Sequence, residues 1–116
     1  MTAQGHPRTI FGRAIKSRNL LVAEMTAREL GRLSLDQSLA LTALVACQEP
    51  ARRTRFAVRW LVRLLEEDDR LSIEEVALVT SALATLGGRG HIEALATLSA
   101  MAEKATRNAR ARRVAS

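Results

Sequence analysis

Apolar residues recur along the chain at the three- and four-residue spacing of amphipathic helices, with charged and polar residues between them. Six segments carry this pattern: 9–17, 19–32, 34–48, 51–68, 72–86 and 91–110. Pro7 and Pro50 are the only prolines, so each long segment can remain helical without a break. The pattern predicts an all-α fold of about six helices arranged in antiparallel hairpins.

Two of the predicted helices have well-marked starts. Ser34 is followed three positions later by Gln37, and Ser72 is followed by Glu75 at the same spacing. This is the spacing of a capping box, in which the serine accepts a backbone N–H and the longer side chain reaches back to the backbone of the serine. We therefore expect helices to begin directly after Ser34 and Ser72.

The segments that follow these two caps are apolar almost all round. Their large apolar residues are Leu35, Leu39, Leu41, Leu44 and Val45 in the first, and Ile73, Val76, Leu78, Val79, Leu83 and Leu86 in the second. A helix without a charged face is normally enclosed by its neighbours. Both segments are therefore expected to be sandwiched between other helices.

Segment 51–68 is amphipathic instead. At 100° per residue its apolar residues fill an arc of about 200°. They are Ala57, Val58, Trp60, Leu61, Val62, Leu64 and Leu65. A stripe of arginines, Arg52, Arg55, Arg59 and Arg63, lies on the opposite side, and Phe56 projects among them. An aromatic ring there stacks on the arginines, packs under a neighbouring helix or awaits a partner.

Residues 32–46 and 70–84 share an Arg-Leu-Ser start and matching Thr and Ala positions, thirty-eight residues apart. Each is followed by a less apolar helix, so over residues 10–104 the chain resembles a short helical-hairpin repeat array of the HEAT or tetratricopeptide kind. Units at 33–70 and 71–108 would follow a terminal helix pair. The other reading is that any two capped Leu/Ala helices look this similar, and that the fold is a compact bundle. The resemblance implies protein binding through one face and assigns no site residue.

The chain is short enough for a single domain, with a flexible lead over 1–8 and a basic tail from about 105 to 116. The net charge is +6, and no acidic residue follows Glu103. The basic residues beyond it are Lys104, Arg107, Arg110, Arg112 and Arg113. The tail either extends the last helix or frays into a solubilising end. Its charge suits nucleic acid, acidic proteins and anionic surfaces without selecting among them.

The sequence offers little for catalysis. Cys47 is the only cysteine, which excludes an intramolecular disulfide, and we expect a buried, inert thiol. His6 and His91 are expected to be exposed or capping, the acidic run 66–69 to form a solvated turn or contact arginines, and the glycines of 87–90 to link two helices. We therefore expect no enzyme, no cofactor and no metal site.

These features favour a binding or adaptor module in which Arg52, Arg55, Phe56, Arg59 and Arg63 hold an acidic protein partner. The alternative is a nucleic-acid-binding protein that uses the same stripe together with the basic tail. Self-association is also expected, because a two-unit array leaves an apolar end uncovered. No apolar run suits a signal peptide or a membrane span, so a cytoplasmic location is expected.

Overall fold

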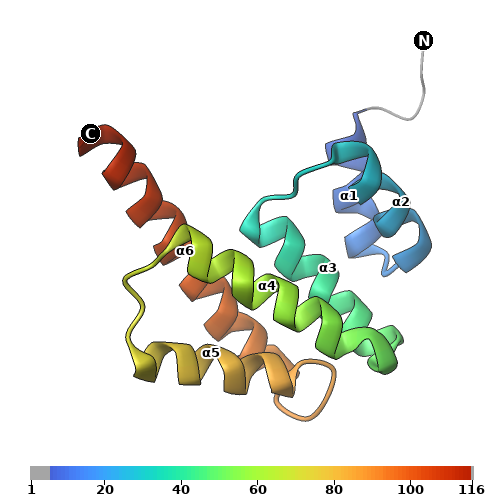
Figure 1. Cartoon of the computed structure of the whole chain (residues 1–116). Coiled ribbons are helices and arrows are strands. Elements are labelled where there is room, and N and C mark those ends of the chain that lie inside the picture. The colour runs from blue at the N-terminus through green and yellow to red at the C-terminus, as the bar shows by residue number, and fades with distance from the viewer. Residues whose placement is uncertain (1–5, 116) are drawn as a thin grey trace.

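A computed structural model describes residues 6–115 and is all-α (Figure 1). Its elements are α1 (Pro7–Lys16), α2 (Leu20–Leu30), α3 (Leu35–Gln48), the 3-10 turn η1 (Pro50–Arg52), α4 (Arg53–Glu67), α5 (Ile73–Thr85) and α6 (His91–Ala115). Consecutive helices pack as the pairs α1·α2, α3·α4 and α5·α6. The prediction of six helices in sequential hairpins is confirmed, and none of the described helices is long and apolar enough to cross a membrane.

Both predicted capping boxes are present. The Gln37 backbone N–H donates to Ser34 Oγ at 3.1 Å, and the Ser34 backbone N–H donates to Gln37 Oε1 at 2.9 Å. The Ser72 and Glu75 pair forms both reciprocal bonds at 3.0 Å. These bonds satisfy N–H groups that have no partner inside the helix, so the sequence fixes where α3 and α5 begin.

Helix α3 lies at the centre of the molecule and contributes to two hydrophobic clusters. One cluster joins α3 to α4, α5 and α6 around Trp60, Leu64 and Leu98. The other joins α3 to α1 and α2, with Phe11 and Leu20 among its buried residues. The Trp60 indole N–H also donates to the carbonyl of the first α3 residue at 3.0 Å, which ties α4 to the start of α3. For α3 the expectation of a sandwiched helix is confirmed.

For α5 the same expectation is wrong. Among the helices of residues 6–115, α5 contacts only α4 and α6, so its remaining side is not covered by any of them. Val79 and Leu83 are buried, whereas Ile73 and Leu78 are exposed. The apolar arc of α4 is likewise only partly covered. Trp60 and Leu64 are buried, whereas Val58, Val62 and Leu65 are exposed to solvent.

Residues 105–115, the basic tail of the sequence, continue α6 as a helix, and the N-terminal helix begins at Pro7, inside the lead expected over 1–8. Residues 1–5 lie outside the described part of the chain. Figure 1 shows the C-terminal half of α6 and the α1–α2 pair on opposite sides of the segment that leads into α3. The arginines of the tail are therefore spaced along a helix.

Candidate binding surface

The four arginines of the stripe differ in their contacts, and Arg52 makes the most hydrogen bonds. Arg52 donates two hydrogen bonds to the Glu24 carboxylate, at 3.0 and 2.5 Å, and a third to Glu49 at 2.8 Å. Its guanidinium also lies over the Phe56 ring, 5.1 Å from the centroid. The hydrogen bond from Arg52 lowers the pKa of Glu24, and the carboxylates raise the pKa of Arg52. Arg52 lies in η1, so these bonds hold α2 against the turn that leads into α4.

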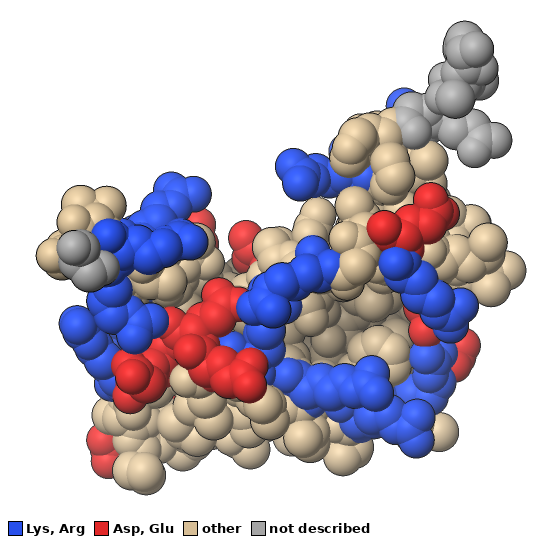
Figure 2. Space-filling model, turned by 45° about the horizontal axis from the view of Figure 1, so that its top comes forward, with Lys and Arg blue, Asp and Glu red and all other residues tan. Residues whose placement is uncertain are grey.

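Phe56 belongs to the edge of the second hydrophobic cluster and is half-buried there. It also lines a depression of about 220 Å³ between α2, the segment before α3, and α4. The other lining residues are Glu24, Ala27, Arg28, Gly31, Leu33 and Leu41. Figure 2 shows basic side chains around a hollow with an uncharged floor on this side of the molecule. Phe56 therefore packs within the molecule and still presents part of its ring at the surface.

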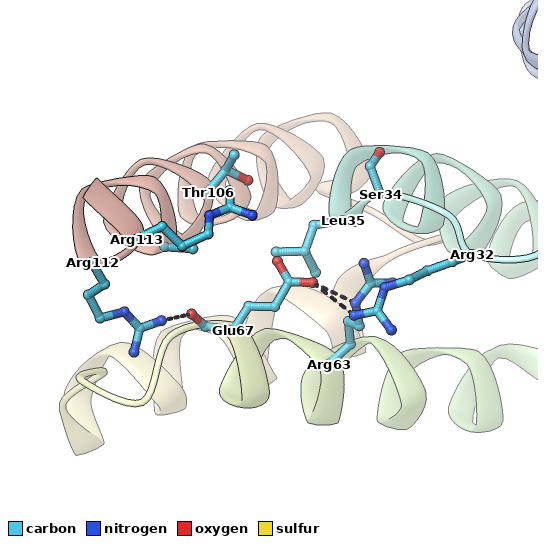
Figure 3. A pocket seen from close by; sticks show the side chains of 9 residues that line it. Arg32, Ser34, Leu35, Arg63, Glu67, Thr106, Arg112 and Arg113 are labelled. Carbon is cyan, nitrogen blue, oxygen red and sulfur yellow. Dashed lines mark hydrogen bonds and ion pairs between the residues drawn. The ribbon is translucent and has the colours of Figure 1, made fainter. Parts of the chain in front are cut away.

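A larger groove of about 630 Å³ lies between the start of α3, the C-terminal half of α4 and the end of α6. The residues that line it are Arg32, Ser34, Leu35, Arg63, Glu67, Thr106, Ala109, Arg112 and Arg113. In Figure 3, Arg63 and Arg32 reach the Glu67 carboxylate, with Arg63 Nε at 2.6 Å and Arg32 Nη2 at 3.9 Å from Oε2. Arg112 donates to the Glu67 backbone carbonyl from the other side of the groove. Four arginines therefore share this groove with a single carboxylate.

A third hollow of about 450 Å³ connects these two. It is lined by Arg8, Arg32, Leu33, Ser34, Gln37 and Arg63. It shares Arg32, Ser34 and Arg63 with the groove and Leu33 with the depression. We call the three hollows together the basic surface; both of its carboxylates, Glu24 and Glu67, are already bound by arginines.

The structure separates the residues singled out in the sequence. Arg63 lies in the groove, whereas Arg55 and Arg59 are exposed and form no hydrogen bond or ion pair with other residues of 6–115. Of the tail residues, Arg112 and Arg113 reach the groove. Arg107 and Arg110 line none of the three hollows of the basic surface.

Lys104, the first basic residue after Glu103, pairs with Glu75 and so holds α6 against the start of α5. This hydrogen bond raises the pKa of Lys104 and lowers that of Glu75. The sequence did not single out Arg8, Arg28 and Arg32. Arg32 stands two residues before the capping serine of α3, so the predicted helix start could have indicated its place.

The acidic run 66–69 makes the arginine contacts that were expected of it, through Glu67 and through Asp69, which lies 3.2 Å from Arg112. Asp68 was not expected to be buried, yet it is only 2% exposed. Its carboxylate accepts from the Arg70 backbone N–H and from the Asn108 amide. Asp68 thus closes the end of α4 onto α6.

Cys47 and His91 meet although 44 residues separate them. The Cys47 Sγ lies 3.8 Å from His91 Nε2, and both residues line a small hollow between α1, α3 and α6. The Gly87 backbone N–H donates to His91 Nδ1 at 2.8 Å, which assigns the proton of the neutral ring to Nε2. An Nε2 that carries a proton can neither accept one from the thiol nor bind a metal. Among residues 6–115 no three metal-ligating side chains cluster.

Comparison of the chain with protein-family models, with curated proteins and with solved structures gives no match. The resemblance to helical-hairpin repeats is therefore supported only by the sequential pairing of the helices.

Proposed function

We propose that this chain is a non-enzymatic binding module that holds an acidic segment of a partner protein along the basic surface. The observation that carries the proposal is the groove, where Arg32, Arg63, Arg112 and Arg113 surround one carboxylate. Glu67 is bound by Arg63 and Arg32, and Arg112 also pairs with Asp69. The lining of the groove still holds four arginines and one carboxylate, which favours an acidic ligand. Guanidinium groups suit this role because one planar guanidinium can donate two parallel hydrogen bonds to one carboxylate.

The depression next to the groove favours a protein ligand. Its floor includes Leu33, Leu41 and Phe56, which offer apolar contact to an aliphatic or aromatic side chain. Exposed ion pairs contribute only about 0.2–1 kcal/mol each, whereas a buried large apolar side chain contributes about 1.5–3 kcal/mol. A segment that combines acidic residues with one such side chain would therefore bind more tightly than a purely acidic one.

Nucleic acid is the second candidate, and one observation favours it. The continuation of α6 to Ala115 brings Arg112 and Arg113 of the tail to the same groove as Arg63 of the stripe. Arginines on both sides of a groove can contact phosphates along one strand, and such binding weakens steeply as salt is added.

Fluorescence anisotropy with defined probes separates these candidates. The probes are two peptides of equal charge, one of glutamates alone and one with Leu or Phe among them, and single- and double-stranded DNA. We expect the mixed peptide to bind at least about tenfold more tightly than the glutamate peptide, because only it can fill the depression. Tighter binding of DNA than of either peptide, with a steep salt dependence, would instead support the second candidate.

The matching variants are Arg32→Glu with Arg63→Glu in the groove, and Arg13→Glu with Arg89→Glu, which change net charge equally but line none of the three hollows. Peptide binding should be lost in the groove variant and kept in the control. Equal losses in both would show that net charge alone attracts the peptide, and no binding by the unchanged protein would refute the proposal.

A further inference from the structure

The outer face of α4 carries a row of aliphatic side chains that no described helix covers. Val58, Val62 and Leu65 are 52%, 48% and 37% exposed. Their spacing of four and three residues places them in line along the helix. Beside Val58 the row opens into a hollow of about 180 Å³ between α4 and α5, which is lined mainly by apolar and small residues. Its lining includes Val58, Leu61, Thr80, Leu83 and Ala84.

Charged residues follow one edge of this row. At 100° per residue, Arg55, Arg59 and Glu66 all project to the same side of Val62, and Val58 and Leu65 project to the other. All three charged residues are exposed and make no hydrogen bond or ion pair with residues 6–115. Arg55 and Arg59 precede Val62 in the chain, whereas Glu66 follows it. The outer face of α4 thus has a positive half and a negative end.

The apolar and charged residues of this face are placed so that two copies of the face can match each other across a twofold axis at Val62. Val58 and Leu65 lie at nearly equal distances on either side of Val62, and so do Arg59 and Glu66. Consider a twofold axis at Val62 that is perpendicular to α4 and lies between two antiparallel copies of the helix. The charged edges of both copies then lie on one side of the pair, and the Val58 and Leu65 edges lie on the other. Each Arg59 then stands level with the Glu66 of the other copy, and each Leu65 with the other Val58.

We propose that two copies of this chain associate through α4, antiparallel and with Val62 at the twofold axis. The Leu65 side chain of each copy enters the hollow beside Val58 of the other, and Arg59 pairs with Glu66 across the interface at both ends. The groove residues Arg32, Arg63 and Arg112 are not part of this contact, so the dimer and the proposed ligand can coexist.

A second copy fits this face better than an unrelated partner does, because the face supplies both members of each pair in the required order. The interface is one helix pair with its flanks, which is smaller than the interfaces of stable dimers, and the net charge of +6 opposes close approach. We therefore expect a weak dimer that dissociates in the micromolar range or above.

Sedimentation velocity of the full chain, between about 5 and 500 µM in physiological salt, tests the proposal. We expect a concentration-dependent monomer and dimer equilibrium. Arg59→Glu alone and Glu66→Arg alone should each weaken the dimer about tenfold or more, because each places like charges opposite one another. The double exchange of both residues restores opposite charges and should return the dissociation constant to within about threefold of the original.

A monomer across the whole range would overturn the proposal, and so would a dimer that survives the single exchanges or is not restored by the double one. Disulfide trapping gives an answer that does not depend on those variants. In a Cys47→Ala background, Val62→Cys should form a covalent dimer much faster than Ile92→Cys, which is on α6 and more exposed at 79%. Equal rates at the two positions would mean random collision and would also overturn it.

Discussion

Replacement of Gly87 by alanine is expected to destabilise the fold strongly, for two separable reasons. Gly87 has a φ of +84°, a backbone conformation that costs a residue with a side chain about 1–2 kcal/mol. A Cβ at this position would also stand 2.4 Å from the Ala46 backbone oxygen, so the loop between α5 and α6 would have to move away from α3. That movement would weaken the hydrogen bond from the Gly87 N–H to His91 Nδ1, which contributes about 1 kcal/mol to stability. The free energy of unfolding should therefore fall by about 3 kcal/mol or more.

Gly90 provides the matched control. Its φ of +85° is nearly the same, yet a Cβ there would meet only a side-chain methyl, Thr85 Cγ2 at 3.3 Å, so Gly90→Ala should cost mainly the conformational term of about 1–2 kcal/mol. Urea denaturation can be followed by the fluorescence of Trp60, the only tryptophan, which is 1% exposed in the fold. Equal losses of stability in the two variants would refute the close approach of the loop to α3.

Three further predictions concern the core, a helix cap and an ion pair. Trp60→Phe removes the indole N–H that bonds to the Leu35 carbonyl and leaves a small cavity, so stability should fall by about 2 kcal/mol in urea denaturation followed by circular dichroism. Ser72→Ala should cost about 1 kcal/mol in the same assay, whereas no loss would contradict the capping box. Arg52 lowers the pKa of Glu24 below its ordinary 4.5, so in acid the unfolded chain binds more protons at this group than the folded chain does. The melting temperature should therefore decrease as the pH falls below about 5. Glu24→Gln should reduce that drop, and an unchanged pH profile would show that the pair contributes nothing.

Most of the fold follows from local rules that act within a few residues. Capping at Ser34 and Ser72, together with apolar spacing, was enough to predict the helices and their order. The sequence could not show how much of each apolar face is covered, because that depends on which helices are neighbours. Ile73 and Val62 belong to apolar patterns like that of Leu39, yet only Leu39 is buried.

The contacts of the arginines were harder to predict, for a related reason. The sequence indicated that Arg52, Arg55, Arg59 and Arg63 share one side of a helix, but whether an arginine is available to a ligand or pairs with a carboxylate depends on contacts between distant segments. Arg52 meets Glu24, 28 residues away, and the arginines of α6 reach the groove only because α6 continues as a helix. No local pattern reveals such contacts, and the same holds for the meeting of Cys47 with His91.

Backbone amide NMR of the ¹⁵N-labelled chain tests most directly whether the basic surface binds an acidic segment. Titration with the mixed acidic and apolar peptide should shift the amide signals of residues that line the groove and the depression, among them Arg32, Leu33, Arg63 and Arg112. Signals from Thr80 and Ala84, in the hollow between α4 and α5, should stay in place. Shifts confined to the hollow between α4 and α5, or no shifts at saturating peptide, would contradict binding at the basic surface.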